Sequence, residues 1–325
     1  MTESETKTQI QLQPQAENIT SPLHRFQHEA MAATFEIIIA DETADYARQF
    51  SLEAFQELDR LEQKLSRYVE NSDITRINHL LPGQPLTVSE QTFEALEISA
   101  RLCAETDGAF DVTVGLLMNC LLNKDKTPRQ NIPADELDYA RRRTGLHLLQ
   151  RNKGKFTVQV LIDHLQIDLG GIGKGFALDQ LAALLRDWNI PAALLHCYST
   201  ALAVGSPSGA AGWPITISHP RQPQKQLARL HLKDQALSGS GLQQGQHILD
   251  PRTAQPVTGR FAAWALAPDG ATADALSTAF LVMTPDEVKK YCDRRPNTLA
   301  LVFIPTTATD KEKILPFGPW KNQLL

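Results

Sequence analysis

The chain has 325 residues, of which 42% are hydrophobic and 21% charged, and its formal net charge is −5. This is the composition of an ordinary globular protein, large enough for one large domain or two smaller ones. The negative charge argues against a surface for nucleic acids or acidic lipids, and no apolar run is long enough to span a membrane.

The first twenty residues, MTESETKTQIQLQPQAENIT, are polar and lack the basic and apolar regions of a secretory signal peptide. We expect residues 1–22 to form a disordered arm and residues 23–325 to form a single domain. The four cysteines are far apart and form no CxxC pair, which is typical of reduced thiols. These features predict a cytoplasmic protein without a lipid anchor.

Hydrophobic periodicity and capping residues predict both helices and strands. In chain order we expect a strand at 35–40, a helix at 44–68, a turn at 82–83, a helix after Ser89, a short helix from Ala134, strands at 156–158 and 165–169, a helix after Lys174, strands at 192–195, 213–218 and 228–232, a helix at 272–283, a helix after Thr284 and a strand at 299–304. Because strands and helices are mixed without strict alternation, the pattern favours an α+β fold with mixed or antiparallel sheets.

The most informative stretch is IDLGGIGKGFALD at 167–179. An apolar run ends at Asp168 and breaks at glycines 170–171, and a helical pattern starts near Lys174. We therefore expect a strand, a glycine-rich turn and a helix start. Free backbone N–H groups and a lysine at a helix N-terminus suit an anionic ligand such as a phosphate.

Two well-known phosphate-binding motifs are excluded at this turn. A Walker A loop is excluded because Leu169 and Gly175 occupy the positions of its first glycine and its Ser or Thr. The dinucleotide fingerprint is excluded because Phe176 stands where its third glycine belongs. An ordinary strand-to-helix turn remains an alternative.

The segment ADALSTAFLVM at 273–283 carries a second candidate site. Asp274 and Thr278 are four residues apart and therefore share one face of the predicted helix. Their oxygens, with a backbone carbonyl and a phosphate oxygen, suit Mg²⁺. The alternative is purely structural: an acidic residue that the helix dipole favours and a threonine that bonds back to its own helix.

Other polar side chains are weaker candidates. His247 could act as a general base, although a histidine at a strand end often has a structural role. Asp111 and Thr113 alternate with apolar neighbours, which predicts that both face a ligand from a strand at the edge of a sheet. Tyr68 could stack on an aromatic ring, although helix capping explains its surroundings equally well.

Taken together, the segments resemble the FAD:protein FMN transferase (ApbE-like) family from about residue 29 to the C-terminal region. The matching segments, in the order of the family, are MAATFEI (31–37), LSRYVENSDITRIN (65–78), DGAFDVTVG (107–115), IDLGGIGKGFALD (167–179), ALSGSG (236–241), HILDPRT (247–253) and ADALSTAF (273–280).

The resemblance implies an ApbE-like, T-fold-like architecture with a flavin cleft between subregions. It also implies a Mg²⁺-dependent enzyme that cleaves the FAD pyrophosphate and releases AMP. The FMN moiety would pass to a Thr or Ser hydroxyl of a target flavoprotein, while some members of the family hydrolyse FAD instead.

The resemblance also assigns residues to roles. The metal ligands would be the carbonyl of Gly173, Asp274 and Thr278, and the residues at the reaction centre would be His247 and Asp274. The flavin-binding set would be Met31, Tyr68, Asp111, Thr113, Lys174, Asp179, Tyr198, Ser199, Ser238, Gly239 and His247. In this set Asp179 would face the adenosine part and Tyr68 would lie near the flavin.

Two departures from the family pattern affect these assignments. Tyr198 and Ser199 replace a usual Gly-Gly pair, and Ala254 replaces a glycine that favours a turn. Bulkier residues at a close backbone approach would reshape the flavin pocket. The alternatives are therefore a degenerate relative that binds FAD or another nucleotide without turnover, and an FAD pyrophosphatase. The sequence names neither the acceptor protein nor the oligomeric state.

Overall fold

A large antiparallel sheet forms the centre of the computed structural model, which describes residues 10–12, 19, 21–123, 127–242, 248–305, 311–320 and 323–325. From one edge to the other its strands are β16 (Lys313–Phe317), β15 (Leu299–Ile304), β14 (Ala262–Ala267), β11 (Gln235–Gly241), β8 (Thr200–Val204), β7 (Ala192–Cys197), β3 (Ala33–Ala40) and β2 (Leu23–Ala30). Every neighbouring pair in this sheet is antiparallel.

Three smaller sheets accompany the central one. The first contains β1 (Ile10–Leu12), β9 (Trp213–His219) and β10 (Gln222–Leu232), the second β4 (Leu86–Thr87), β6 (Thr157–Val160) and β5 (Leu149–Asn152), and the third β12 (Leu249–Asp250) and β13 (Gln255–Pro256).

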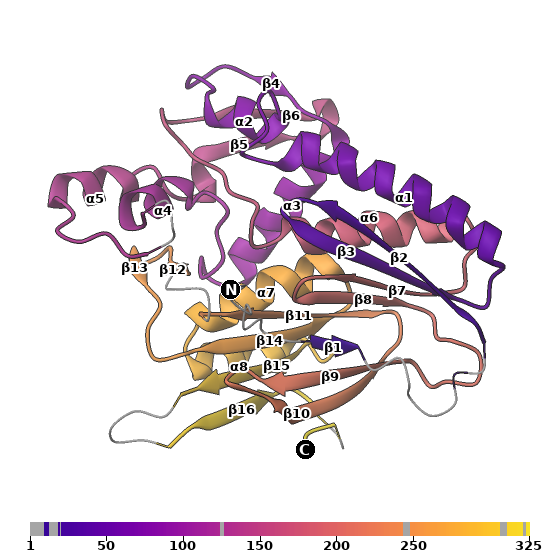
Figure 1. Ribbon diagram of the computed structural model, residues 1–325. Coiled ribbons are helices and arrows are strands. Elements are labelled where there is room, and N and C mark those ends of the chain that lie inside the picture. The colour runs from indigo at the N-terminus through magenta and orange to yellow at the C-terminus, as the bar shows by residue number, and fades with distance from the viewer. Residues whose placement is uncertain are drawn as a thin grey trace, which may run out of the picture.

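The α-helices come from several parts of the chain (Figure 1). They are α1 (Ala44–Leu65), α2 (Asp73–Asn78), α3 (Glu90–Glu105), α4 (Gly115–Leu121), α5 (Ala134–Arg141), α6 (Gly173–Asp187), α7 (Gly270–Val282) and α8 (Pro285–Arg294), with short 3-10 turns η1 (Leu146–Leu148) and η2 (Lys153–Lys155).

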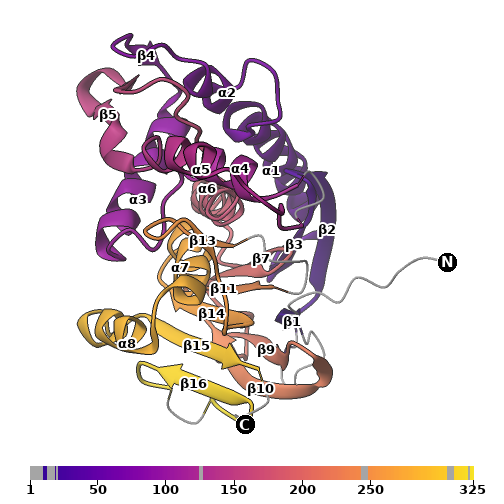
Figure 2. The same cartoon turned by 90° about the vertical axis from the view of Figure 1, so that its left-hand side faces the viewer.

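The central sheet is buried on both faces. On β3, Ile37 and Ile39 belong to the core that the helices share, whereas Ile38 belongs to a second core with β9 and β10. This follows from the two-residue period of a strand, which points successive side chains to opposite faces. Figures 1 and 2 show α1, α6 and α7 on one side of the sheet and the β9–β10 pair on the other. The predicted α+β class with antiparallel sheets is confirmed.

Capping residues set several helix boundaries as the sequence predicts. The side chain of Ser89 accepts a hydrogen bond from the N–H of Thr92 at the start of α3. Thr284 and Glu287 form a capping box at the start of α8. The first long helix ends at Leu65, because Ser66 is already extended, and so is shorter than the predicted 44–68.

The predicted strand at 165–169 is wrong. These residues form no strand, and the structure records only one bridge among them, between Gln166 and Val114. The Asn78 side chain takes the place of a strand neighbour: it donates to the Ile167 carbonyl at 3.0 Å and accepts from the Ile167 N–H at 2.6 Å. A side-chain amide can satisfy both backbone groups of one residue, and a hydrophobicity pattern does not reveal it.

The predicted edge position of Asp111 and Thr113 is also wrong. Residues 112–113 form a turn, and α4 begins at Gly115. A Cβ on Gly115 would lie 2.8 Å from the Gln166 carbonyl oxygen, so two backbone segments meet here. The alternation of polar and apolar residues in this stretch arises from a turn with two buried polar side chains.

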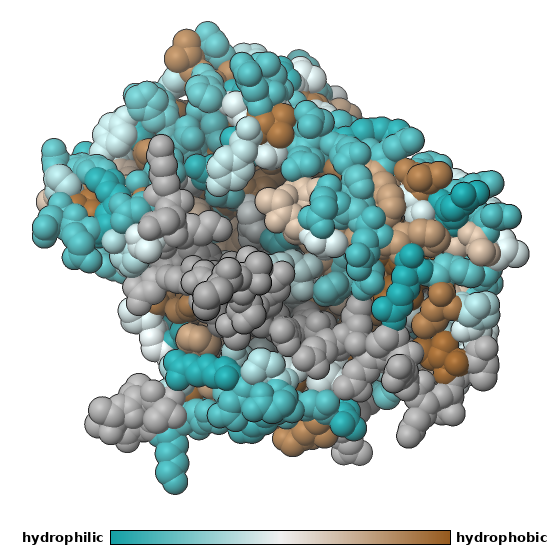
Figure 3. Space-filling model, in the orientation of Figure 1, coloured by the Kyte–Doolittle hydropathy of each residue, from teal (hydrophilic) through white to brown (hydrophobic). Residues whose placement is uncertain are grey.

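Part of the stretch expected to be a disordered arm has regular structure. Residues 10–12 form β1 and pair with β9, with Ile10 opposite Ile217. Within the described residues, no helix is both long and apolar enough to cross a membrane. The described side chains on the face in Figure 3 are mostly hydrophilic, and the hydrophobic ones form small separate areas.

Candidate functional site

Two hairpin turns and the start of α6 meet at one end of the central sheet. The β2–β3 turn contains Met31, and the β7–β8 turn contains Tyr198 and Ser199. Since β3 pairs with β7, with Phe35 opposite Cys197, the two turns lie at the same end of the sheet. The methyl carbon of Met31 lies 3.4 Å from the point that a Cβ on Gly173 would occupy. Four residues of the predicted site thus gather here.

Helices α6 and α7 pack side by side in opposite directions, in a regular register. A Cβ on Gly171 would lie 3.5 Å from Thr278 Oγ1. Four residues further along the chain, in the first turn of α6, the N–H of Gly175 donates to Asp274 Oδ2 at 3.1 Å. Thr278 and Asp274 are one helical turn apart on α7, and Gly173, the first residue of α6, lies between Gly171 and Gly175 in the chain. The structure therefore brings the three predicted metal ligands to one place.

The regular pairing of α6 with α7 continues for one more helical turn. The carboxylate of Asp179 accepts from the N–H groups of Gly270 at 2.6 Å and Ala271 at 2.8 Å. Asp179 on α6 thus caps the start of α7, while Asp274 on α7 caps the start of α6. Each carboxylate sits at a helix N-terminus, where unsatisfied N–H groups favour negative charge.

The Asp274 carboxylate is buried among polar partners, and the residue is only 4% exposed. Lys174 Nζ lies 4.0 Å from Oδ2, and Ser238 Oγ lies 3.4 Å from Oδ1. The negative charge of Asp274 raises the pKa of Lys174 above its usual range. The site therefore places the ammonium group of Lys174 beside the carboxyl group of Asp274.

The glycine turn before α6 is held by side chains from distant segments. Lys174 Nζ donates to the Gly170 carbonyl at 3.0 Å, and the Gly170 N–H donates to Asp168 Oδ1 at 2.7 Å. The other oxygen of Asp168 accepts from Arg67 at 2.9 Å, and both side chains are largely buried. Arg67 was not predicted as a site residue, because nothing in its neighbourhood in the sequence indicates a partner 101 residues away.

A set of hydroxyl groups surrounds Asp274 and Thr278, and most of them were not predicted. Ser240 Oγ lies 2.7 Å from Ser277 Oγ and 3.2 Å from Thr278 Oγ1. Ser238 Oγ, which was predicted, lies 2.8 Å from the hydroxyl of Thr200. The available signal was the spacing of the two serines on β11, which places both on the same face of the strand.

These residues fit a magnesium ion by the chemistry of their donors. Asp274 and Thr278 offer hard oxygens, and Mg²⁺ is usually bound by one or two carboxylates together with substrate phosphates and water. Nowhere among the described residues do three or more His, Cys, Asp or Glu side chains form a possible metal site.

Two of the three positions at which the family pattern has glycine lie in left-handed backbone. Tyr198 has φ 55° and Ala254 has φ 54°, values that favour glycine. Ser199 is buried, and its carbonyl accepts from the N–H of Gly239 at 2.8 Å. The hairpin therefore has its turn with Tyr198 and Ser199 in place of the two glycines, and the partly buried Tyr198 side chain packs against the core that the helices share.

Asp111 and Thr113 belong to a buried network. The N–H and hydroxyl groups of Thr113 both donate to Asp111 Oδ1, at 2.8 and 2.7 Å. The second carboxylate oxygen accepts from the N–H of Leu146, and Thr113 Oγ1 accepts from the N–H of Gly145. The two residues tie the 111–113 turn to the 145–146 segment, and a direct role in flavin binding stays a prediction.

Of two further predicted residues, Tyr68 and His247, the structure describes only Tyr68. Tyr68 is 84% exposed, and the Arg67 guanidinium lies 5.4 Å from the centre of its ring. Its ring is therefore available to a ligand or a partner. His247 lies outside the described residues, so its role as a base stays a prediction.

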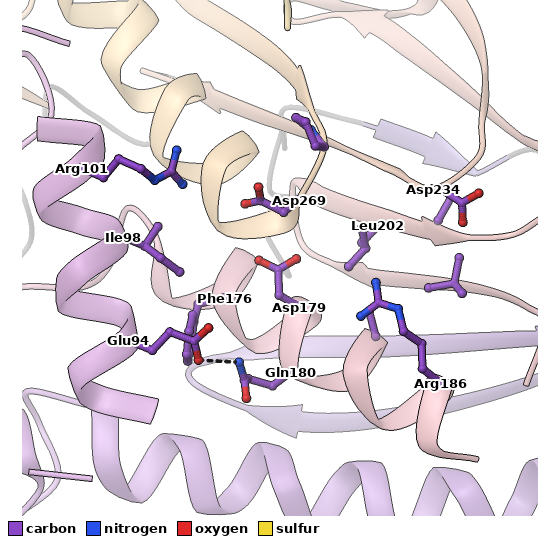
Figure 4. Close-up of a pocket in the computed structure, with 14 residues that line it drawn as sticks. Glu94, Ile98, Arg101, Phe176, Asp179, Gln180, Arg186, Leu202, Asp234 and Asp269 are labelled. Carbon is purple, nitrogen blue, oxygen red and sulfur yellow. Dashed lines mark hydrogen bonds between the residues drawn. The ribbon is translucent and has the colours of Figure 1, made fainter. Parts of the chain in front are cut away.

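A pocket of about 290 Å³ lies beside Asp179, between α3, α6, β8 and the start of α7 (Figure 4). Burial, together with the charge of Asp269, raises the pKa of Asp179 to about 7, although two backbone hydrogen bonds act in the opposite direction. Figure 4 shows the Asp179 and Asp269 carboxylates close together in the wall of this pocket. The pocket contains none of the three predicted metal ligands.

Known proteins match both the sequence and the fold. The model of the ApbE family matches residues 31–303. An FAD:protein FMN transferase of Klebsiella pneumoniae is 29% identical over 82% of this chain and 79% of its own length. A Vibrio cholerae FAD:protein FMN transferase is 30% identical over 70% of this chain and 71% of its own length.

Solved structures of ApbE proteins have a similar fold. The flavin transferase ApbE from Vibrio cholerae has a TM-score of 0.82 at 25% identity, covering 94% of this chain and all of that chain. The ApbE protein of Thermotoga maritima has a TM-score of 0.79 at 26% identity, covering 91% and 97% of the two chains. With the family model matching most of its length, this chain belongs to the ApbE family.

Proposed function

We propose that the protein is a Mg²⁺-dependent FAD:protein FMN transferase. It would transfer FMN from FAD to a Thr or Ser hydroxyl of a target flavoprotein and release AMP. The activity is that named for its relatives. The observation that carries the proposal is the register of α6 and α7, which places Asp274 and Thr278 beside the glycine turn.

The residues of the site suit a pyrophosphate substrate. The ammonium group of Lys174 would bind phosphate oxygens. The carbonyl of Gly173, Asp274 and Thr278 would hold Mg²⁺, which offsets the charge on the transferred phosphoryl group and the leaving AMP. His247 would deprotonate the acceptor hydroxyl. Because Asp274 is nearly inaccessible to water, its interaction with a cation would be stronger than at the surface.

The test is a reaction with FAD, Mg²⁺ and an acceptor protein that the Vibrio cholerae relative modifies. We expect AMP release and covalently bound flavin on the acceptor, detected by mass spectrometry. Asp274→Asn preserves the shape of the side chain and should abolish both, while Asp286→Asn, an exposed change on α8, should abolish neither. Full activity of Asp274→Asn would refute the proposal.

Tyr198 favours a second candidate function, a family member that binds FAD without turnover. Its ring stands where relatives have glycine and would narrow the flavin pocket. Tight FAD binding without AMP release would support this reading. Release of AMP and free FMN, with no flavin on any acceptor, would instead indicate an FAD pyrophosphatase. The single domain over 23–325 and a cytoplasmic location stay predictions.

A further inference from the structure

We propose that Asp179 is a positioning residue, whose carboxylate holds the start of α7 and so keeps Asp274 and Thr278 in register with Gly173. The kinetic part of this inference rests on the proposed function, while its structural part does not. It assigns Asp179 a role inside the protein in place of the contact with adenosine that the family resemblance implies.

Both oxygens of the Asp179 carboxylate are engaged. Oδ1 accepts from the N–H of Gly270 at 2.6 Å and Oδ2 from the N–H of Ala271 at 2.8 Å. A carboxylate in this bidentate position cannot turn toward a ligand without leaving two N–H groups at a helix N-terminus unsatisfied. The geometry therefore favours an internal role.

Two carboxylates together satisfy the first turn of α7. Asp269, the N-cap, accepts from the N–H of Thr272 at 2.7 Å, so that with the two bonds to Asp179 each of the first three N–H groups has a partner. Arg101 also donates to the Thr272 hydroxyl at 3.2 Å. The start of α7 is thus clamped from α3 and α6, and Figure 4 shows these side chains converging there.

The clamp can transmit its position to the site because the helices meet through backbone atoms. A Cβ on Gly270 would lie 2.5 Å from the carbonyl oxygen of Gly175, so no side chain separates the two helices at that level. One turn along α7, Asp274 accepts from the N–H of Gly175. A shift at the start of α7 would therefore move Asp274 relative to α6 directly, and packed interiors transmit such shifts.

The kinetic test compares Asp179→Asn with Asp234→Asn. The asparagine retains one acceptor oxygen but turns an NH₂ group toward the second N–H. Asp234 lines the same pocket and accepts from the N–H of Gly205, and among the described residues no hydrogen bond or ion pair joins it to α7. For Asp179→Asn we expect kcat for AMP release to fall about ten-fold and the Mg²⁺ concentration for half-maximal rate to rise about ten-fold.

In the same variant the KM for FAD should change little, and Asp234→Asn should behave as wild type. A raised KM for FAD with unchanged kcat would mean that Asp179 contacts the substrate, and an unchanged Mg²⁺ requirement would mean that it does not position the metal ligands. Either result would overturn the proposal. A wild-type protein that releases no AMP would count against the proposed function only.

Hydrogen exchange tests, without any enzymatic reaction, the structural part of the inference, namely that Asp179 holds the start of α7. In the absence of FAD and Mg²⁺, Asp179→Asn should speed exchange of the amides from Gly270 to Thr278, and Asp234→Asn should not. If Asp179→Asn does not fold, the wild-type protein serves instead. Coupling is reciprocal, so Mg²⁺, once its binding is verified by calorimetry, should slow exchange at Gly270 and Ala271. Unchanged exchange at these two amides would overturn the inference.

Discussion

The N–H of Gly175 donates to the carboxylate of Asp274 at 3.1 Å, at a point where two helices touch through their backbones. A Cβ on Gly175 would clash with the Gly270 carbonyl and lie 2.8 Å from Cβ of Asp274. The absence of a side chain is therefore what allows a carboxylate on α7 to cap α6.

Gly175→Ala should push the two helices apart. We expect the free energy of unfolding to fall by about 1–3 kcal/mol, as for other overpacked cores, and AMP release to be largely lost because Asp274 moves. Urea unfolding and an AMP assay measure the two effects. Gly154→Ala is the control, since the nearest atom to its Cβ would be 3.6 Å away. Normal activity of Gly175→Ala would show that the close approach is not required.

Ser240→Ala should weaken the support of Thr278. The serine hydroxyl lies within hydrogen-bond distance of Ser277 and Thr278, and a lost hydrogen bond of this kind costs about 1 kcal/mol. We expect a modest loss of stability and a several-fold higher Mg²⁺ requirement, measured by a Mg²⁺ titration of the AMP assay. Ser208→Ala, at an exposed position, provides the comparison. An unchanged Mg²⁺ requirement would show that the Ser240 hydroxyl does not support the metal site.

The ionisation of Asp179 should make stability depend on pH. Its pKa is raised to about 7 in the folded protein, whereas an unfolded aspartate titrates near ~3.9. Between these values the folded state binds one more proton than the unfolded state, so this contribution to stability is lost as the pH rises from about 4 to 7.

The effect amounts to about 1.4 kcal/mol for each unit of difference between the two pKa values. Urea unfolding at about pH 5 and pH 8 should show a larger decrease for wild type than for Asp179→Asn. Equal pH dependence of the two proteins would contradict the raised pKa. Above about pH 7 the ionised carboxylate of Asp179 accepts two hydrogen bonds from α7, and bonds to a charged acceptor are stronger. We therefore expect Asp179 to hold α7 most firmly in the pH range in which its proton no longer contributes to stability.

Tyr198→Gly should reveal what the tyrosine does in the flavin pocket. Glycine relieves a left-handed conformation that costs a larger residue about 1–2 kcal/mol, and it removes the ring from the tip of the hairpin. We expect tighter FAD binding by calorimetry and faster AMP release. Weaker FAD binding would instead identify Tyr198 as a flavin contact.

Local signals predicted much of the fold correctly. The caps at Ser89 and Thr284, the apolar strand at 299–304 and the helix after Lys174 depend on residues that are near each other in the chain. Hydrophobic periodicity and capping are properties of short windows, which explains why these elements could be predicted. Polar residues that satisfy distant backbone groups were the source of error: Asn78 replaced a strand neighbour, and Asp111 with Thr113 formed a buried turn.

The sequence by itself determined the family, most of the helices and the spacing that places Asp274 and Thr278 on one face of a helix. Only the tertiary structure decided that Asp179 and Asp274 cap each other's helices, that Arg67 holds the glycine turn through Asp168, and that hydroxyl groups of β11 surround the site. These relationships join residues that are tens of positions apart. Their geometry depends on how backbones pack, which no local pattern encodes.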